Sequence, residues 1–448
     1  MNLKNMMAVS GVMSALVMFA ATPVVSDVDM TQADNSRSVT ISYRLTGAPA
    51  VVTLDVETNG PNGWVSIGGE HIQRVSGDVW KKVSGKETYS MVWRPDLDWP
   101  DHIVPEGGAR AKVTAWALDN TPKYMVVDIT EGAPVNPEKV RYYPEEEFLP
   151  GGLLKNPDYR TTSIVMRRIP AAGVEWTMGS VDETGRQAAR EKSHKVKLDD
   201  DYYMGVFEIT QKQWLLVAGY NNSYFKRISG LNDMRPVEFI SYNEVRLADG
   251  KNESSNQLFV NDSTANYPAA PHPDSFLGKL RKRTGLAFDL PSESQWEFAA
   301  RAGNGEWHWG NGSLYNGEYK CPNQPGRSQR NGGTISPNWD EPARDCDETM
   351  GTAFVGTYAQ NDWGLFDCHG NVNELCLDFF KEDITGDNGA VSIPSDVNLT
   401  MVCRGGGYSH RSKECRSAHR HASYSYGRYS TVGLRVFCPM GNKREREE

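Results

Sequence analysis

The hydrophobic pattern of this chain changes character near residue 130, and that change constrains the fold more than any other feature. Over residues 37–128, apolar residues alternate with polar ones in short runs, one of which contains Val39, Ile41 and Tyr43. Turn signals such as NGPNG separate these runs. Alternation with a period of two is typical of half-buried strands. We therefore expect an all-β domain over residues 37–130, of the immunoglobulin-like or fibronectin-like sandwich type.

The chain beyond residue 130 has a different composition. Residues 131–160 are rich in Pro, Glu and Gly and are expected to form a linker. From 161 to 440, loops rich in Gly, Asn, Asp and Trp dominate, and helical windows are few and short. Two helices are expected to begin after Thr210 and Ser292, and Ser292 forms a capping box with Gln295. Residues 441–448 are expected to be a charged, frayed tail.

The N-terminus and the overall charge limit the location and the partners. Residues 1–26 have the pattern of a secretory signal peptide, because Lys4 precedes an apolar run that is too short to span a bilayer. We expect an exported protein, periplasmic or extracellular, and not an integral membrane protein. A net charge of -9 argues against general nucleic-acid binding. All seven cysteines lie beyond residue 320, and export would permit disulfides among them.

Several motifs over residues 161–440 occur in an order that resembles the sulfatase-modifying-factor family, the family of formylglycine-generating enzyme. The quoted segments include EITQKQW (208–214), LPSESQWEFAARAG (290–303), GLFDCHGNVNEL (364–375), CRGGGY (403–408) and GLRVF (433–437). The resemblance implies an α+β domain with the C-type-lectin-like fold and little regular secondary structure. It also implies a disulfide between Cys403 and Cys438, since both flank strands that pair in the family.

The segment DCHGNVNE has a chemistry that suits calcium. Two carboxylates in an extended segment, together with backbone carbonyls, make a set of hard oxygen ligands. The resemblance places the calcium ligands on Asp367, Gly370, Val372 and Glu374. It also implies a second calcium site, which falls on Asn323, Asp347 and Thr349.

The segment GGGYSHRSKEC corresponds to the active loop of the family oxidase, in which two cysteines hold a copper ion. Soft thiolates suit Cu(I). The two cysteine positions fall on His410 and Cys415, so the catalytic pair is incomplete. The serine that helps to form the oxygen pocket falls on Gly407, and a tryptophan of the active-site floor falls on Asn373. The resemblance thus implies a formylglycine-generating oxidase, acting on a sulfatase cysteine, with three changes around one site.

Alternatives to this oxidase stay open. His410 and Cys415 are candidates for a copper or iron site with His419 or His421 as a third ligand. Cys415 is otherwise a buried small side chain or half of a disulfide, and the other two histidines are otherwise surface groups.

The domain is alternatively a non-catalytic, calcium-stabilised binding module. Its cleft would be lined by Trp363, Arg404, Tyr408 and Arg416 and would hold a peptide or an anionic, sulfated glycan. Arginine favours such anions through bidentate pairing. The expected partners are a sulfatase or another exported polypeptide, or a sulfated glycan.

Overall fold

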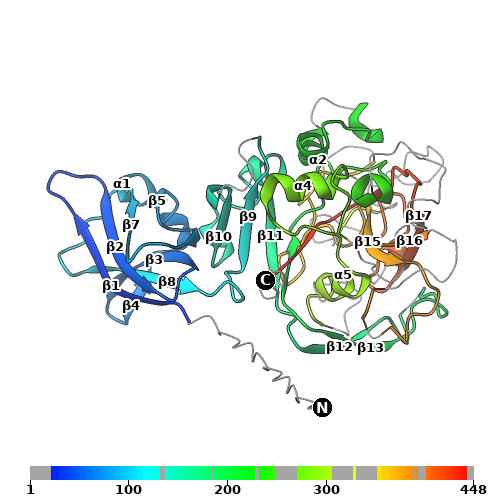
Figure 1. Cartoon of the computed structure of the whole chain (residues 1–448), viewed down its shortest axis with the longest axis horizontal. Coiled ribbons are helices and arrows are strands. Elements are labelled where there is room, and N and C mark those ends of the chain that lie inside the picture. Colours follow the sequence, from blue (N-terminus) through cyan, green and yellow to red (C-terminus); the bar gives the residue numbers. More distant parts are fainter. Residues whose placement is uncertain are drawn as a thin grey trace, which may run out of the picture.

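The computed structural model describes most of the chain and divides it into an N-terminal β region and a larger C-terminal region. The described residues are 22–131, 137–183, 185–227, 232–247, 270–304, 326–328, 351–387, 389–391 and 400–440. The N-terminal strands lie at one end of the molecule and the helices α2, α4 and α5 at the other (Figure 1). Among the described residues, no helix has the length and apolar content needed to span a membrane.

The N-terminal region consists of two antiparallel sheets. The first has the order β1 (Val24–Gln32), β2 (Val39–Thr46), β7 (Thr88–Trp93) and β5 (Val75–Gly77). The second has the order β4 (Gly63–Ser66), β3 (Ala50–Gly60) and β6 (Lys81–Val83), and β8 (Ala109–Trp116) also pairs with β3. Alternate residues of β2 and β3, among them Ile41 and Leu54, are buried in one hydrophobic cluster. The strands follow the alternation in the sequence, and the immunoglobulin-like type stays a prediction.

The first strand corrects one predicted boundary. β1 begins at Val24, and Val24 pairs with Thr46 of β2. The strand therefore starts inside the segment predicted as a signal peptide, and the β region starts before residue 37. Residues 1–21 lie outside the described part of the chain.

A five-stranded sheet joins the two regions and corrects a second boundary. Its order is β10 (Val140–Tyr143), β9 (Tyr124–Asp128), β11 (Ser163–Ile169), β14 (Tyr202–Gly205) and β19 (Phe437–Pro439). β9 was expected in the sandwich and β10 in a linker, but both add to the edge of the C-terminal sheet. Val126 and Val127 of β9 pair with Val165 and Ile164 of β11, whose buried side chains extend the core. β10 then pairs with the other edge of β9.

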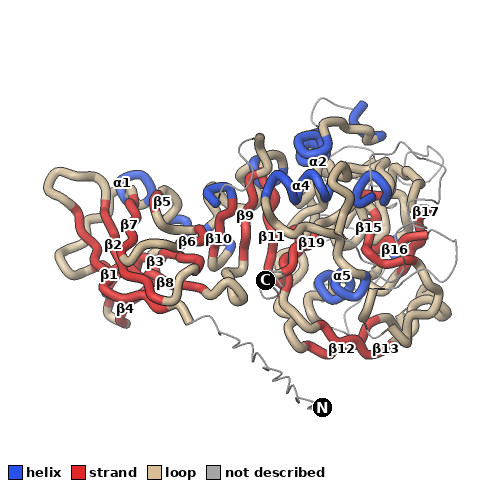
Figure 2. Tube along the Cα trace, in the orientation of Figure 1, coloured by secondary structure: helices blue, strands red, loops and turns tan. Residues whose placement is uncertain are grey.

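One hydrophobic cluster continues across the junction, which explains why residues 140–160 are not a free linker. It contains Val56 and Tyr89 of the N-terminal sheets, Phe148 of the expected linker, and Phe207 and Phe366 of the C-terminal region. In Figure 2, β9, β10 and β11 lie between the two parts of the molecule.

Among its described residues, the C-terminal region contains two further sheets and three helices of eight or nine residues. One sheet has the order β17 (Arg420–Tyr424), β16 (Thr400–Arg404), β15 (Asn373–Phe379) and β18 (Val432–Gly433), and the other pairs β12 (Val174–Met178) with β13 (His194–Leu198). The helices are α2 (Gln211–Ala218), α4 (Phe276–Thr284) and α5 (Glu293–Ala300). The short turns are α1 (Pro95–Asp98), η1 (Gly69–His71), η2 (Pro137–Lys139), η3 (Glu146–Phe148), η4 (Pro157–Arg160), η5 (Tyr224–Arg227), η6 (Asn232–Met234), η7 (Asn243–Leu247) and η10 (Ser412–Glu414).

The predicted helix starts are confirmed. The Ser292 hydroxyl accepts a hydrogen bond from the Gln295 N–H at 3.2 Å, and the Gln295 side chain accepts one from the Ser292 N–H at 2.9 Å. Thr210 and Gln213 form the same capping box. α5 ends at Ala300. These caps supply partners for N–H groups that the helix itself leaves unpaired.

Candidate functional site

The loop that follows β16 folds tightly over the thiol of Cys415. Gly405 and Gly406 have φ values of 89° and 73°, in the left-handed region that favours glycine. A Cβ on Gly406 would lie 2.6 Å from the Cys415 sulfur, so this close approach also requires glycine. The short turn η10 then brings the chain back to Cys415. Local backbone geometry therefore places the thiol beneath the loop.

His410 is held by its own loop. Its Nδ1 accepts a hydrogen bond from the Gly407 N–H at 2.8 Å, and the Asn373 amide lies 3.5 Å from the same atom. Because a backbone N–H only donates, Nδ1 carries no proton and the imidazole is neutral. Burial lowers the pKa of His410 and favours the same state. The structure thus brings together His410, Gly407 and Asn373, the positions at which the sequence departs from the oxidase pattern.

The Cys415 side chain is a buried thiol. The residue is 1% exposed, and burial raises the pKa of its thiol well above the ordinary value. Its sulfur lies 3.6 Å from the Arg411 carbonyl oxygen, which accepts the S–H. Within the described ranges, no group of three or more His, Cys, Asp or Glu side chains is arranged to hold a metal ion. A neutral imidazole and a buried thiol do not fit the bis-thiolate copper site of the oxidase.

His419 and His421 were expected at the surface, but His419 is buried and His421 is half-buried. The His421 ring centroid lies 4.7 Å from that of His410 and 4.4 Å from that of His419. The Nε2 of His421 donates to the Glu414 carbonyl at 3.1 Å. His419 is 3% exposed and lies 3.1 Å from Glu191. The two imidazoles therefore pack behind the loop and support it.

The predicted calcium segment lies in a buried cluster of carboxylates. One Asp367 oxygen accepts from the Gly356 N–H at 2.7 Å, whereas Oδ1 is buried with no hydrogen-bond partner in the described structure. Glu208 is fully buried and accepts from the Val372 N–H at 3.1 Å. Burial and the neighbouring carboxylates raise the pKa of Glu208. Burial raises that of Asp367 to about 7.

Glu374 has a different environment from the one expected of a calcium ligand. Its carboxylate accepts from Arg435 at 2.6 and 2.9 Å and from the Trp296 indole N–H at 2.6 Å. Asp367, with its unpartnered oxygen, and the surplus of buried carboxylate fit an added cation, whereas Glu374 is already paired. Glu208 and Arg435 were not predicted as site residues, although they lie in the motifs EITQKQW and GLRVF. Asn323, Asp347 and Thr349 lie outside the described residues.

The predicted cleft arginines are buried, which is a correction. Arg404 is 0% and Arg416 2% exposed. Arg404 pairs with Glu297, and Arg416 pairs with Glu183 and with Glu191 at 2.9 Å. A buried guanidinium needs such carboxylate partners to offset its loss of hydration. These two arginines therefore hold the interior together and do not present charge to a ligand.

The other two cleft residues are also packed inside. Tyr408 is 5% exposed, and its hydroxyl lies 3.1 Å from that of Ser430. The half-buried Trp363 packs edge-on against Phe298, with ring centroids 5.2 Å apart. The four predicted residues therefore do not line an open cleft.

The predicted disulfide is absent from the described structure. Cys403 in β16 and Cys438 in β19 are both free and buried, in different sheets. The family resemblance suggested this pair, but each thiol packs into the hydrophobic core as a small apolar group.

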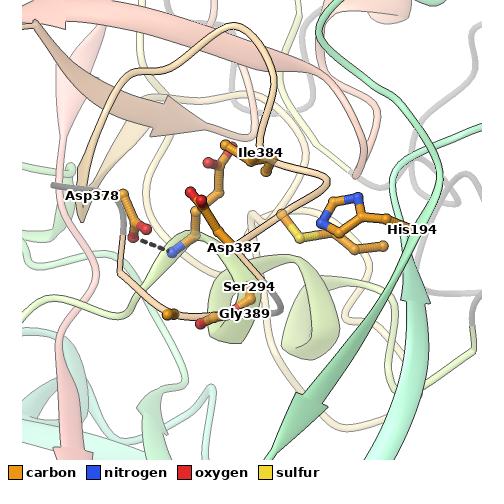
Figure 3. A pocket seen from close by; sticks show the side chains of 9 residues that line it. His194, Ser294, Asp378, Ile384, Asp387 and Gly389 are labelled. Carbon is orange, nitrogen blue, oxygen red and sulfur yellow. Dashed lines mark hydrogen bonds between the residues drawn. The ribbon is translucent and has the colours of Figure 1, made fainter. Parts of the chain in front are cut away.

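A small polar pocket lies beside α5 (Figure 3). Its lining includes His194, Ser294, Asp378 and Asp387. Asp378 accepts from the Glu293 N–H at 2.6 Å, and the Ser294 hydroxyl donates to the Gly389 carbonyl at 3.0 Å. These groups are engaged with the surrounding chain, so the pocket adds no separate chemistry to the site.

Comparison with known families assigns the C-terminal region. The family model for the sulfatase-modifying factor enzyme 1-like domain matches residues 157–439, well over half of the chain. The chain belongs to the sulfatase-modifying factor family. This confirms the resemblance that the order of the motifs indicated.

Individual relatives match over shorter stretches. Chaperone protein LppX of Paenibacillus barcinonensis is 27% identical over 195 residues, which cover 42% of this chain and 66% of that protein. Formylglycine-generating enzyme of Thermomonospora curvata is 34% identical over 98 residues, covering 21% of this chain and 28% of the enzyme. The match thus spans less than two thirds of either relative.

Two solved structures are distant likenesses of this chain. Treponema denticola variable protein 1 is 22% identical with a TM-score of 0.43, covering 62% of this chain and 96% of that one. PvdO from Pseudomonas aeruginosa is 20% identical with a TM-score of 0.45, covering 61% and 94%.

Proposed function

We propose that this chain is an exported binding protein of the sulfatase-modifying factor family and that it has no formylglycine-generating activity. The observation that carries the proposal is the state of the residue pair at the copper position. Cys415 is 1% exposed with a raised thiol pKa, and its counterpart is His410. Thiol oxidation needs an accessible thiolate, and this arrangement supports neither accessibility nor ionisation. The leader-like pattern of residues 1–26 supports export.

The oxidase assay tests this proposal directly. The purified protein is incubated with Cu(I), oxygen and a peptide that carries the sulfatase motif Cys-x-Pro-x-Arg, and the peptide is analysed by mass spectrometry. We expect no conversion of the peptide cysteine to an aldehyde. Aldehyde formation that is lost in Cys415→Ser would refute the proposal and restore the oxidase.

A matched variant shows whether the missing cysteine is the cause. His410→Cys restores the thiol pair of the oxidase pattern but leaves Gly407 and Asn373 in place. We expect this variant to bind copper more tightly than the wild type. Cu(I) is a soft ion and prefers two thiolate ligands to one thiolate and one imidazole. Equal copper binding by both proteins would show that the loop, and not residue 410, determines the chemistry.

We also propose that calcium binds at Asp367 with Gly370 and Val372, while Glu374, the fourth predicted ligand, stays paired with Arg435. The unpartnered Asp367 oxygen and the surplus of buried carboxylate support a cation there. When bound, the ion would neutralise this surplus and fix the loop. A ligand present at a hundredfold excess over its Kd stabilises the folded state by about 2.7 kcal/mol. We therefore expect calcium to raise the thermal midpoint relative to EDTA in the wild type but not in Asp367→Asn, and equal midpoints in the wild type would contradict the site.

A further inference from the structure

Exposed aromatic side chains lie at the end of β17 and just after it, and the exposed Phe239 adjoins them. Tyr424, Tyr426 and Tyr429 are 49%, 46% and 41% exposed, and Phe239 is 38% exposed. The rings of Tyr424 and Tyr426 are stacked, with centroids 5.5 Å apart and an interplanar angle of 19°. We call these four residues the tyrosine surface. It is distinct from the loop that covers Cys415.

Backbone contacts hold the surface together. The Phe239 N–H donates to the Tyr429 carbonyl at 3.0 Å, which places the two residues side by side. The Tyr429 ring lies directly over Gly427, where a Cβ would be 2.5 Å from a ring atom. These contacts bring the exposed Phe239 next to Tyr429 and hold the Tyr429 ring over Gly427.

The backbone of Phe239 is in an unusual conformation. Its φ is 61°, a region that bulky residues rarely adopt. Its neighbours Val237 and Ile240 are both fully buried, so the surrounding core fixes this conformation. Strain of this kind persists only where the structure imposes it, and it is often associated with a functional surface. Here it keeps a large apolar ring in contact with solvent.

The part of the tyrosine surface between Tyr424 and Tyr429 carries no unbalanced charge. The only charged residue between Tyr424 and Tyr429 is Arg428. Its guanidinium donates to both carboxylate oxygens of Glu244, at 2.9 and 3.1 Å. The chemistry presented to solvent is therefore that of aromatic faces and phenol hydroxyls, which favours a neutral ligand over an anionic one.

The backbone at Ser425, just beyond the end of β17, is already paired within the chain. β17 pairs with β16 on one side. Beyond its end, the Ser425 carbonyl accepts from the Asn243 N–H at 3.1 Å. An extended peptide would need free backbone groups at Ser425, whereas a ligand recognised by ring packing would not.

We propose that the tyrosine surface binds a neutral oligosaccharide. One face of a pyranose ring is rich in C–H groups and packs against an aromatic ring, while the sugar hydroxyls hydrogen-bond to polar groups such as phenols. This proposal rests on the proposed role as a binding protein and specifies its ligand class.

The test measures binding to defined sugars. The full-length protein is titrated by calorimetry with neutral hexasaccharides of β-1,4-linked glucose, N-acetylglucosamine, xylose and mannose, and with a sulfated heparin hexasaccharide. We expect binding to at least one neutral hexasaccharide and weaker binding to the sulfated one. Tyr424→Ala combined with Tyr426→Ala should weaken the neutral interaction at least about tenfold, since each lost ring contact is worth about 1 kcal/mol. Tyr424→Phe should retain most of the affinity.

The control is Leu215→Ala, which removes an exposed apolar side chain of α2 in the same C-terminal region. This variant should bind the sugars like the wild type. Binding to none of the neutral sugars, preference for the sulfated one, or equal affinity of the double variant would overturn the proposal. Binding of a proline-rich peptide at these tyrosines in place of a sugar would also overturn it and leave the binding role intact. Only aldehyde formation in the oxidase assay would overturn the binding role itself.

Discussion

Arg404 is the residue whose replacement most clearly separates an internal role from a ligand-binding one. Its Nη1 donates to the carbonyl oxygens of Ala418 and His419, both at 2.9 Å, and its Nη2 pairs with Glu297. Glu297 also pairs with Arg301 at 2.8 Å, so it would keep one partner in Arg404→Leu. Loss of one member of a buried pair costs about 3–5 kcal/mol. Since Arg301 remains, we take the lower end of that range.

The two carbonyl groups raise the expected effect. A buried acceptor that loses its donor costs about 1–3 kcal/mol, and the contributions of neighbouring groups do not add fully. We therefore expect Arg404→Leu to lower the free energy of unfolding by about 4 kcal/mol. The free energy is measured by urea titration at neutral pH, followed by tryptophan fluorescence.

The matched control is Arg190→Leu. Arg190 lies 3.4 Å from Glu382, and its side chain is 40% exposed. An exposed pair of this kind contributes less than about 1 kcal/mol, so the control should be close to the wild type. If Arg404→Leu also changed the free energy by less than about 1 kcal/mol, the buried ion-pair argument would be refuted and a place for Arg404 in a cleft would return.

The remaining predictions concern a helix cap, a carboxylate and two thiols. Ser292→Ala should destabilise the protein by about 1 kcal/mol in the same titration, because it removes the cap of α5. Burial opposes ionisation of Glu191, but its basic partners outweigh that effect and lower its pKa from 4.5 to about 2. The stabilising effect of Glu191 should therefore be complete above pH 4.5 and be lost as the pH falls toward 2. The thermal midpoint should fall with pH over this range, and Glu191→Gln should reduce that fall. Cys403 and Cys438 should both alkylate after denaturation without reductant, and a peptide in which they are disulfide-linked would contradict the structure.

The local elements of the fold were predictable because their signals are local. Alternation over a few residues identified β2 and β3, and the three-residue spacing of Ser292 and Gln295 identified the start of α5. The sheet to which a strand belongs was not predictable in this way. β9 is a run of four buried apolar residues followed by Asp128, and nothing in that run indicates that its partner is β11. A strand pattern specifies a buried face and leaves the identity of its neighbour open.

At the candidate site, the sequence showed the chemistry that is missing, and the structure showed the state of what remains. His410 and Asn373 are visible as departures from the motif without any coordinates. The burial of Cys415 depends on how its own loop folds over the thiol, and the engagement of Glu374 depends on Arg435, 61 residues away, so neither is visible in the sequence. The exposed tyrosines went unnoticed for the same reason, because exposure is a property of the folded surface.

The sequence by itself determined the family, the short helices and the incomplete copper pair, because each is encoded by neighbouring residues or by the order of motifs. Only the tertiary structure decided what the arginines do. Clustered in sequence, they suggested an anion-binding cleft, but Arg416 meets Glu183 across a separation of 233 residues. A guanidinium loses its hydration when buried, and a carboxylate brought to it by the fold offsets that loss. Because of this pairing, Arg416 forms an internal ion pair and does not bind a ligand as the sequence predicted.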